Sequence, residues 1–255
     1  MTLKPQNLAG LEAAAGQTAL DEALSATLDR WQKESSQLAR AGIYDWLTSR
    51  ISGQRILEIG CGFGASTAAL VRAGKTVMAL DNRMDCLKAT QQRVPEAIYG
   101  LADVHHYDER LLDDLREFAP DAVICWLAGA PADSLPRDVP AAYAVMQHRL
   151  VLQRAVVRLA ARLDNVQTVH LADRTAFPWK MRDAGRQTMA RMIGTAVCPD
   201  SPFSLTEADI QFRRIEAPLS AATTATSVGK ALPGVVPVIG EATLMRSSNR
   251  RHNLS

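Results

Sequence analysis

The spacing of apolar residues along the chain changes near residue 51. Between residues 17 and 51 apolar side chains recur mostly at intervals of three, four or seven, which is typical of amphipathic helices. From residue 55 onward, short apolar runs alternate with helical patterns. We therefore predict a helical N-terminal cap over residues 1–50, a main domain over residues 51–247 and a frayed tail over residues 248–255.

The alternating region predicts a sheet with helices packed on it. Strands are expected at residues 55–59, 76–80, 97–101, 122–126 and 166–171, and helices at 66–73, 84–93, 108–118 and 141–162. Strands that alternate with helices at this spacing form a parallel sheet through right-handed crossovers. The predicted fold class is therefore α/β, a doubly wound, mostly parallel sheet with helices on both faces.

The last third of the chain is predicted to complete this sheet. After the fifth strand we expect a loop through Pro178 and Trp179, followed by a helix at 182–193 and strands at 209–217 and 234–246. Pro237 has no N–H for a strand ladder, so it predicts an edge position for the last strand. Residues 218–233 are rich in small and hydroxyl side chains, and we expect a mobile loop there.

A run of glycines follows the first predicted strand. Gly60, Gly62 and Gly64 lie between that strand and a helix, where backbone N–H groups and the helix dipole meet the polar end of a ligand. Gly60, Gly62 and Ala65 also satisfy the spacing of a dinucleotide fingerprint. The glycines alone leave a dinucleotide and another adenosine ligand both open.

Two acidic residues follow the next two predicted strands. Asp81 lies 21 positions after Gly60, where a carboxylate accepts hydrogen bonds from both ribose hydroxyls of an adenosine ligand. Asp103, in the segment GLADV, is placed to accept a hydrogen bond from an adenine amine, and is equally typical of a residue that forms a turn. The order of glycines and acids is more selective than either alone.

The segments LEIGCGFGAST, ALDNR, LADV and DAVICW resemble the class I methyltransferases that use S-adenosylmethionine (SAM), over about residues 43–130. The resemblance implies that SAM is the cofactor and that the sheet has strand order 3-2-1-4-5-7-6 with an antiparallel last strand. It implies a cofactor site of Glu58, Gly60, Gly62, Gly64, Asp81, Asn82, Asp103, Val104 and Trp126. An NAD(P) oxidoreductase is the weaker alternative, because the Tyr-x-x-x-Lys pair of short-chain dehydrogenases is absent. Glu58 also suits a cationic cofactor better than a pyrophosphate.

The methyl acceptor is expected beyond the fourth and fifth strands, near residues 125–134. Trp126 is a candidate for stacking on a planar acceptor or on adenine, and equally a residue at the edge of the core. Asp133 is the candidate general base. His105 and His106 are expected on the surface and His170 in the core. The signatures of the DNA base methyltransferases are absent here.

The charge distribution suggests an anionic acceptor. The net charge is +2, but residues 141–191 carry nine basic residues against three acidic ones. Such a region could bind a nucleic acid, or a phosphorylated or aromatic small molecule. Its arginines are also explained as the solvated face of a helix. After the fifth strand, Asp173, Arg174, Trp179 and Lys180 are expected to converge on the acceptor rim.

The remaining features limit the class of protein. The four cysteines have no metal-ligand spacing, so we expect buried free thiols and no metal. With neither a signal segment nor a membrane span in the sequence, we expect a cytoplasmic protein. The sequence thus predicts a SAM-dependent methyltransferase. The alternative is a SAM-binding scaffold subunit without turnover, with a second copy or a partner protein held by the N-terminal helices.

Overall fold

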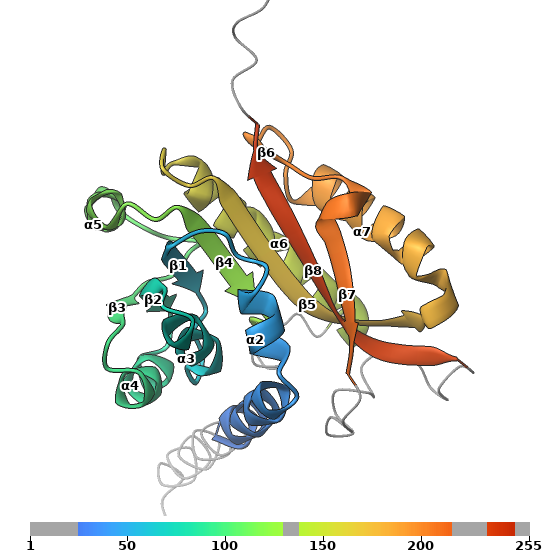
Figure 1. Ribbon diagram of the computed structural model, residues 1–255, viewed down its shortest axis with the longest axis horizontal. Coiled ribbons are helices and arrows are strands. Elements are labelled where there is room, and N and C mark those ends of the chain that lie inside the picture. Colours follow the sequence, from blue (N-terminus) through green and yellow to red (C-terminus); the bar gives the residue numbers. More distant parts are fainter. Residues whose placement is uncertain (1–24, 130–137, 216–233, 248–255) are drawn as a thin grey trace, which may run out of the picture.

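The computed structural model of the chain describes residues 25–129, 138–215 and 234–247 (Figure 1). The predicted loop at 218–233, the predicted tail and the candidate base Asp133 lie outside these residues. Before the first strand, residues 25–40 are helical and α2 (Ile43–Thr48) follows them, as the apolar spacing predicted.

Strands and helices then alternate as expected. The strands are β1 (Arg55–Ile59), β2 (Thr76–Asp81), β3 (Ile98–Leu101), β4 (Ala122–Trp126) and β5 (Thr168–Pro178). The helices between them are α3 (Ala65–Arg72), α4 (Met84–Arg93), α5 (Glu109–Phe118) and α6 (Ala141–Ala161). Up to the start of β5, every boundary lies within two residues of its predicted position.

The final part adds three strands, one long helix and two 3-10 turns. These are the 3-10 turn η2 (Trp179–Met181), α7 (Arg182–Ala196), β6 (Phe203–Ser204), the 3-10 turn η3 (Glu207–Asp209), β7 (Ile210–Arg214) and β8 (Val235–Arg246). The sheet order is β3-β2-β1-β4-β5-β8-β6, and β7 also pairs with β8. β8 runs antiparallel to β5 and β7, so the predicted order is confirmed, with the short β6 as an additional strand.

Two predictions about this part are wrong. Residues 172–178, expected as a loop, continue β5, because they pair with residues 235–241 of β8. β8 is not an edge strand, because it has partners on both sides. Pro237 is tolerated because it lies where the β7 ladder ends. The Pro237 carbonyl accepts a hydrogen bond from the Ile215 N–H at 3.0 Å. Because proline has no N–H, one hydrogen bond at the end of the ladder between β7 and β8 is lost.

The two faces of the sheet carry different helices. One hydrophobic cluster joins the sheet to α5, α6 and α7, with Leu112, Leu159 and Ile193 among its members. The other joins it to the helix at residues 25–40, α2, α3 and α4, with Leu38 and Leu70 among its members. The N-terminal helices are therefore part of one of the two layers on the sheet.

Long-range polar contacts attach the N-terminal segment to the far strands. Arg213 of β7 donates to the carbonyls of Gly42 and Ala41, at 3.0 and 3.1 Å. Gly42 has φ 67°, a left-handed conformation that glycine adopts without strain, and it directs the chain from one helix into the next. Figure 1 shows α2 beside the end of β4.

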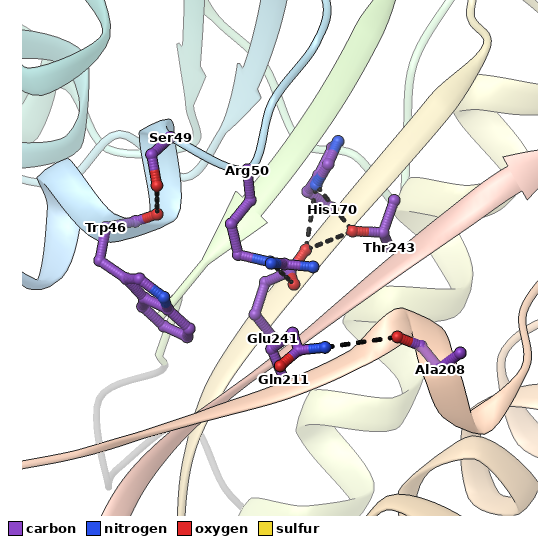
Figure 2. Close-up of polar contacts among 8 residues, drawn as sticks. All are labelled: Trp46, Ser49, Arg50, His170, Ala208, Gln211, Glu241 and Thr243. Carbon is purple, nitrogen blue, oxygen red and sulfur yellow. Dashed lines mark hydrogen bonds and ion pairs between the residues drawn. The ribbon is translucent and has the colours of Figure 1, made fainter.

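A second attachment is centred on Glu241, whose side chain is fully buried (Figure 2). Its Oε2 accepts from Arg50 Nε at 2.5 Å, and its Oε1 lies 2.7 Å from Thr243 Oγ1 and 3.0 Å from His170 Nδ1. Although burial alone would raise it, these partners lower the pKa of Glu241. His170 is a core residue as predicted, but its Nε2 has no hydrogen-bond partner among the described residues.

Candidate functional site

A cavity of about 560 Å³ lies at the carboxyl ends of the first four strands. Its position is where the strand order reverses between β1 and β4, the usual ligand site of doubly wound sheets. One part is lined by the glycine turn after β1 and by residues that follow β2 and β3. The other is lined by the helix at residues 25–40, α2, the end of β4, α6 and β5.

The three glycines of the turn all have positive φ, between 54° and 78°. A Cβ on Gly64 would lie 2.8 Å from Thr90 Cγ2, and one on Gly60 would lie 3.2 Å from Ala128 Cβ. A Cβ on Gly62 would meet nothing within 4 Å, although Gly62 lines the cavity. Packing therefore excludes a Cβ at Gly64 and crowds one at Gly60, whereas Gly62 borders open space that a ligand can fill.

Four backbone N–H groups of this turn donate within the protein, although the sequence predicted that the turn offers its N–H groups to a ligand. The N–H groups of Gly60 and Cys61 donate to Leu80 O, at 2.7 and 3.3 Å, and that of Gly64 donates to Cys61 O. Gly62 N–H donates to Asp81 Oδ2 at 2.9 Å. The sequence did not reveal this because two of the three acceptors, Leu80 and Asp81, lie on the neighbouring strand β2.

Asp81 connects this turn to the cavity. Its second oxygen, Oδ1, accepts from Arg83 N–H at 2.9 Å. Burial raises the pKa of Asp81, although these backbone hydrogen bonds oppose the shift. The carboxyl group is held in a fixed orientation and lines the cavity. Asn82, the next residue, also lines the cavity.

Glu58 lies behind the turn and is not among the described residues that line the cavity. Its carboxyl oxygens accept from the hydroxyls of Ser66 and Thr67, the latter at 2.6 Å, at the start of α3. Burial raises the pKa of Glu58 to about 7, although these hydroxyl contacts oppose the rise. Any effect of Glu58 on a ligand in the cavity therefore acts across the turn.

Asp103 and Val104 line the cavity after β3. Asp103 Oδ1 accepts from His105 N–H at 2.9 Å, and Oδ2 lies 3.0 Å from His106 Nδ1. Although partial burial opposes the shift, these contacts with His106 and His105 lower the pKa of Asp103. His106 is exposed, as predicted, whereas His105 is exposed and also lines the cavity.

The end of β4 forms the middle of the cavity wall. Trp126 is 4% exposed and lines the cavity, and its Nε1 is buried without a partner among the described residues. Leu127 has φ 57°, a left-handed conformation that costs a leucine energy and that is common at functional sites. Asp133 lies beyond the described part of this segment.

The helix at residues 25–40 contributes Trp31, Glu34 and Ser35 to the opposite wall, and α2 contributes Tyr44. The sequence analysis did not identify these residues. Glu34 lies between Trp31 and Leu38 at helical spacing, so it is a carboxylate on an otherwise apolar face. That break in the pattern was the available signal.

Glu34 is paired with Arg174 of β5. Arg174 Nε donates to Glu34 Oε1, and Arg174 Nη1 lies 3.5 Å from Leu127 O. One guanidinium group thus connects the N-terminal helix, β5 and the end of β4. Of the four residues expected to converge on the rim, Arg174 is the only one among the described cavity-lining residues.

The other three rim residues lie elsewhere because β5 continues through this segment. Asp173 points to the opposite face of the sheet and pairs with Arg149 of α6 at 3.0 Å. Trp179 lies beyond the strand, where the guanidinium of Arg214 is 4.3 Å from its ring centroid. Alternation along a strand separates neighbours that a loop would have allowed to converge.

Comparisons with known proteins add to this geometry. No protein-family model matches the chain. Similar solved structures include the magnesium protoporphyrin IX methyltransferase of Synechocystis PCC 6803 with bound S-adenosylhomocysteine (SAH), with 15% identity, a TM-score of 0.48 and 88% and 95% of the two chains covered. A Pyrococcus abyssi tRNA (uracil-54, C5)-methyltransferase has 13% identity and a TM-score of 0.45, with 80% and 37% covered.

Two curated proteins match part of the sequence. A ubiquinone biosynthesis O-methyltransferase of Paracidovorax citrulli (strain AAC00-1) is 36% identical over 89 residues, 34% of this chain and 36% of the relative. A magnesium-protoporphyrin O-methyltransferase of Rhodobacter capsulatus is 29% identical over 73 residues, 29% of this chain and 33% of the relative. Over these segments the chain is similar to O-methyltransferases. It spans about a third of the length of each of these curated relatives.

The cavity has a further histidine that the sequence analysis did not single out. His148 of α6 lines the cavity together with Leu152, one helical turn further along. Burial lowers the pKa of His148, and the charges of His105 and Arg149 lower it further. The neutral imidazole is therefore favoured, which is the form that accepts a proton.

Many arginines of the basic region at residues 141–191 are already paired. Arg149 pairs with Asp173, Arg162 with Glu109, Arg174 with Glu34 and Arg186 with Asp183. The excess of basic residues in the sequence is therefore a poor measure of the positive charge available to a ligand.

The four cysteines are all buried and free, as predicted, and burial raises the pKa of each thiol. No cluster of three or more potential metal ligands occurs within the described ranges. In the same part of the chain, no helix is long and apolar enough to cross a membrane.

Proposed function

We propose that the protein transfers the methyl group of SAM to a small molecule bound in the cavity. The observation that carries this proposal is the composition of the cavity. It combines a glycine turn open at Gly62, the carboxylates of Asp81 and Asp103, and an opposite wall with Trp31 and Trp126. Its volume of about 560 Å³ lies within the range of small-molecule sites.

The residues around the glycine turn fit the cofactor. Asp81 would accept hydrogen bonds from the ribose hydroxyls, and Asp103 from the adenine amine. Asn82 and Val104 would border the adenosine, and Gly62 leaves room for the methionine part. Bound SAM would supply a methyl group activated by its sulfonium, so the protein has to bind and orient the acceptor.

Proton removal from the acceptor is assigned to two candidate residues. His148 lines the cavity and its lowered pKa favours the neutral form. Asp133 remains the candidate from the sequence. The family comparison supports an oxygen acceptor, because both curated relatives are named as O-methyltransferases. An anionic acceptor has less support than its sequence basis suggested, since the arginines nearest the cavity are paired.

We retain residues 1–50 as a cap and residues 51–247 as the main domain. The described part of the cap shares a core cluster with α3 and lines one wall of the cavity, which supports a cap that closes the acceptor side. Binding of a second copy or of a partner protein through these helices stays a prediction. The cytoplasmic location stays a prediction as well.

Calorimetric titration with SAH tests the proposal, with NAD⁺ and NADP⁺ as controls. We expect a dissociation constant of about 1–50 μM for SAH. Asp81→Ala should weaken SAH binding by about 1.5–3 kcal/mol, because hydrogen bonds to a charged acceptor are lost. Asp45→Ala, which removes an exposed carboxylate of α2, should bind SAH normally.

The titration also separates the alternatives. Binding of a nicotinamide dinucleotide without SAH binding would reassign the protein to the oxidoreductases. SAH binding together with no SAH production from SAM across a panel of acceptors would favour the scaffold. Normal SAH affinity in Asp81→Ala would contradict the proposed cofactor site.

A further inference from the structure

The acceptor end of the cavity contains one pair of opposite charges in a mostly apolar wall. We define this end by the side chains from the helix at residues 25–40, α2, the end of β4, α6 and β5. Its large apolar and aromatic members are Trp31, Tyr44, Trp126, Leu127 and Leu152. Among its described members, only Glu34 and Arg174 carry a full charge at neutral pH, given the lowered pKa of His148.

These two charges compensate each other at close range. The Arg174 and Glu34 side chains are 22% and 9% exposed, so water screens their contact only weakly. Arg174 Nη1 also lies 3.5 Å from Leu127 O. The charge that the guanidinium group would offer an anion is therefore offset by the carboxylate of Glu34.

The rest of the cavity does not attract anions either. Its other described charges are Asp81, Asp103 and Arg83, and the last pairs with Asp85 at 3.1 Å. The next cation, Arg149, pairs with Asp173 on the opposite face of the sheet. Over the described lining there are thus three carboxylates against two guanidinium groups.

We propose that Glu34 determines the acceptor class by neutralising Arg174, so that the cavity admits an uncharged aromatic molecule and rejects an anionic one. An uncharged ring gains contacts with the tryptophans and Tyr44 and leaves the pair intact. An acceptor carboxylate near Arg174 lies near Glu34 as well, so it loses hydration without a net electrostatic gain. This inference rests on the proposed function, because it concerns the acceptor of the same cavity.

Glu34→Gln removes the negative charge of Glu34 and leaves the shape of the cavity wall nearly unchanged. The amide oxygen of glutamine can still accept a hydrogen bond from Arg174, whereas the negative charge is removed. Arg174 then becomes an uncompensated cation at the acceptor end. The double variant Glu34→Gln/Arg174→Gln removes both charges and restores neutrality, and Asp45→Asn is the matched control on an exposed ion pair of α2.

The experiment measures the binding of two probes to the SAH-saturated protein at pH 7. The probes are 3,4-dihydroxybenzamide and 3,4-dihydroxybenzoate, which have the same shape and differ in one charge. We expect the wild type and Asp45→Asn to bind the amide at least about tenfold more tightly, a difference of about 1.4 kcal/mol. Glu34→Gln should lower this ratio about tenfold or more, and the double variant should restore it.

Three results would overturn the inference. The first is that the wild type binds the benzoate as tightly as the amide. The second is that Glu34→Gln leaves the ratio of the two affinities unchanged in a protein that still binds SAH. The third is that neither probe binds the wild type at millimolar concentration. None of these affects SAH binding, which tests the proposed function separately. If SAH does not bind, the proposed function fails, and the same probes titrated without SAH still test the pair.

Discussion

The two ends of the cavity are assembled in different ways. The cofactor end comes from consecutive elements, and the contact between Gly62 and Asp81 spans 19 positions. The acceptor end depends on Glu34 and Arg174, which are 140 positions apart, and the cap that carries Glu34 is anchored by Arg50 and Glu241, 191 positions apart. Local order is therefore enough to indicate a cofactor, whereas the acceptor end depends on pairings that only the folded sheet brings together.

The largest effect is expected from breaking the anchor of the cap (Figure 2). Glu241→Ala removes a buried carboxylate and leaves Arg50 and His170 without their partner. We expect a loss of about 3–5 kcal/mol in the free energy of unfolding, measured in urea. Asp45→Ala, which breaks the exposed Asp45–Arg72 pair, should cost no more than about 1 kcal/mol. Equal losses in the two variants would contradict the importance of this anchor.

At the cofactor end, Glu58 predicts a pH dependence of stability. Burial raises its pKa from 4.5 to about 7, so between these values the folded protein binds a proton that the unfolded chain has lost. The free energy of unfolding therefore falls as pH rises through this window, by up to about 3 kcal/mol. Relative to Glu58→Gln, which cannot titrate, the wild type should become progressively less stable from pH 4.5 to 8.

Urea unfolding of both proteins at several pH values, without cofactor, measures this difference. Glu109→Gln is the control, because the Glu109 side chain is 71% exposed. A difference between wild type and Glu58→Gln that does not change with pH would show that Glu58 is ionised in the folded state throughout.

A smaller effect separates two glycines within the turn. Gly64→Ala meets both a positive φ and Thr90, so it should destabilise the fold by about 2–3 kcal/mol. Gly62→Ala meets only the positive φ and should cost about 1–2 kcal/mol. Because its methyl group borders the cavity, Gly62→Ala should lose SAH affinity while it remains folded. Thermal unfolding and SAH titration of both variants measure these effects, and equal losses of stability would contradict the packing difference.

The same contrast explains how much could be predicted from the sequence. The strands up to β4, the glycine turn and Asp81 follow from apolar periodicity and spacing, because each depends on residues nearby in the chain. The continuation of β5 was missed because its partner, residues 235–241, is remote. Glu34 and Tyr44 were missed because nothing local shows that the N-terminal helices cover the end of the sheet. His148 lies on a helix whose orientation toward the cavity is set by packing.

Hydrogen–deuterium exchange with and without SAH tests the central claim most directly, since it maps the cofactor site in the unmodified protein. We expect slower exchange in peptides that contain residues 59–66, 80–83 and 102–105, where the cavity lining belongs to the glycine turn and to the ends of β2 and β3. Exchange at η3 and β6, far from the cavity lining, should not change. If SAH binding slowed exchange only outside the peptides that contain residues 59–66, 80–83 and 102–105, the assignment of the cofactor site would be contradicted.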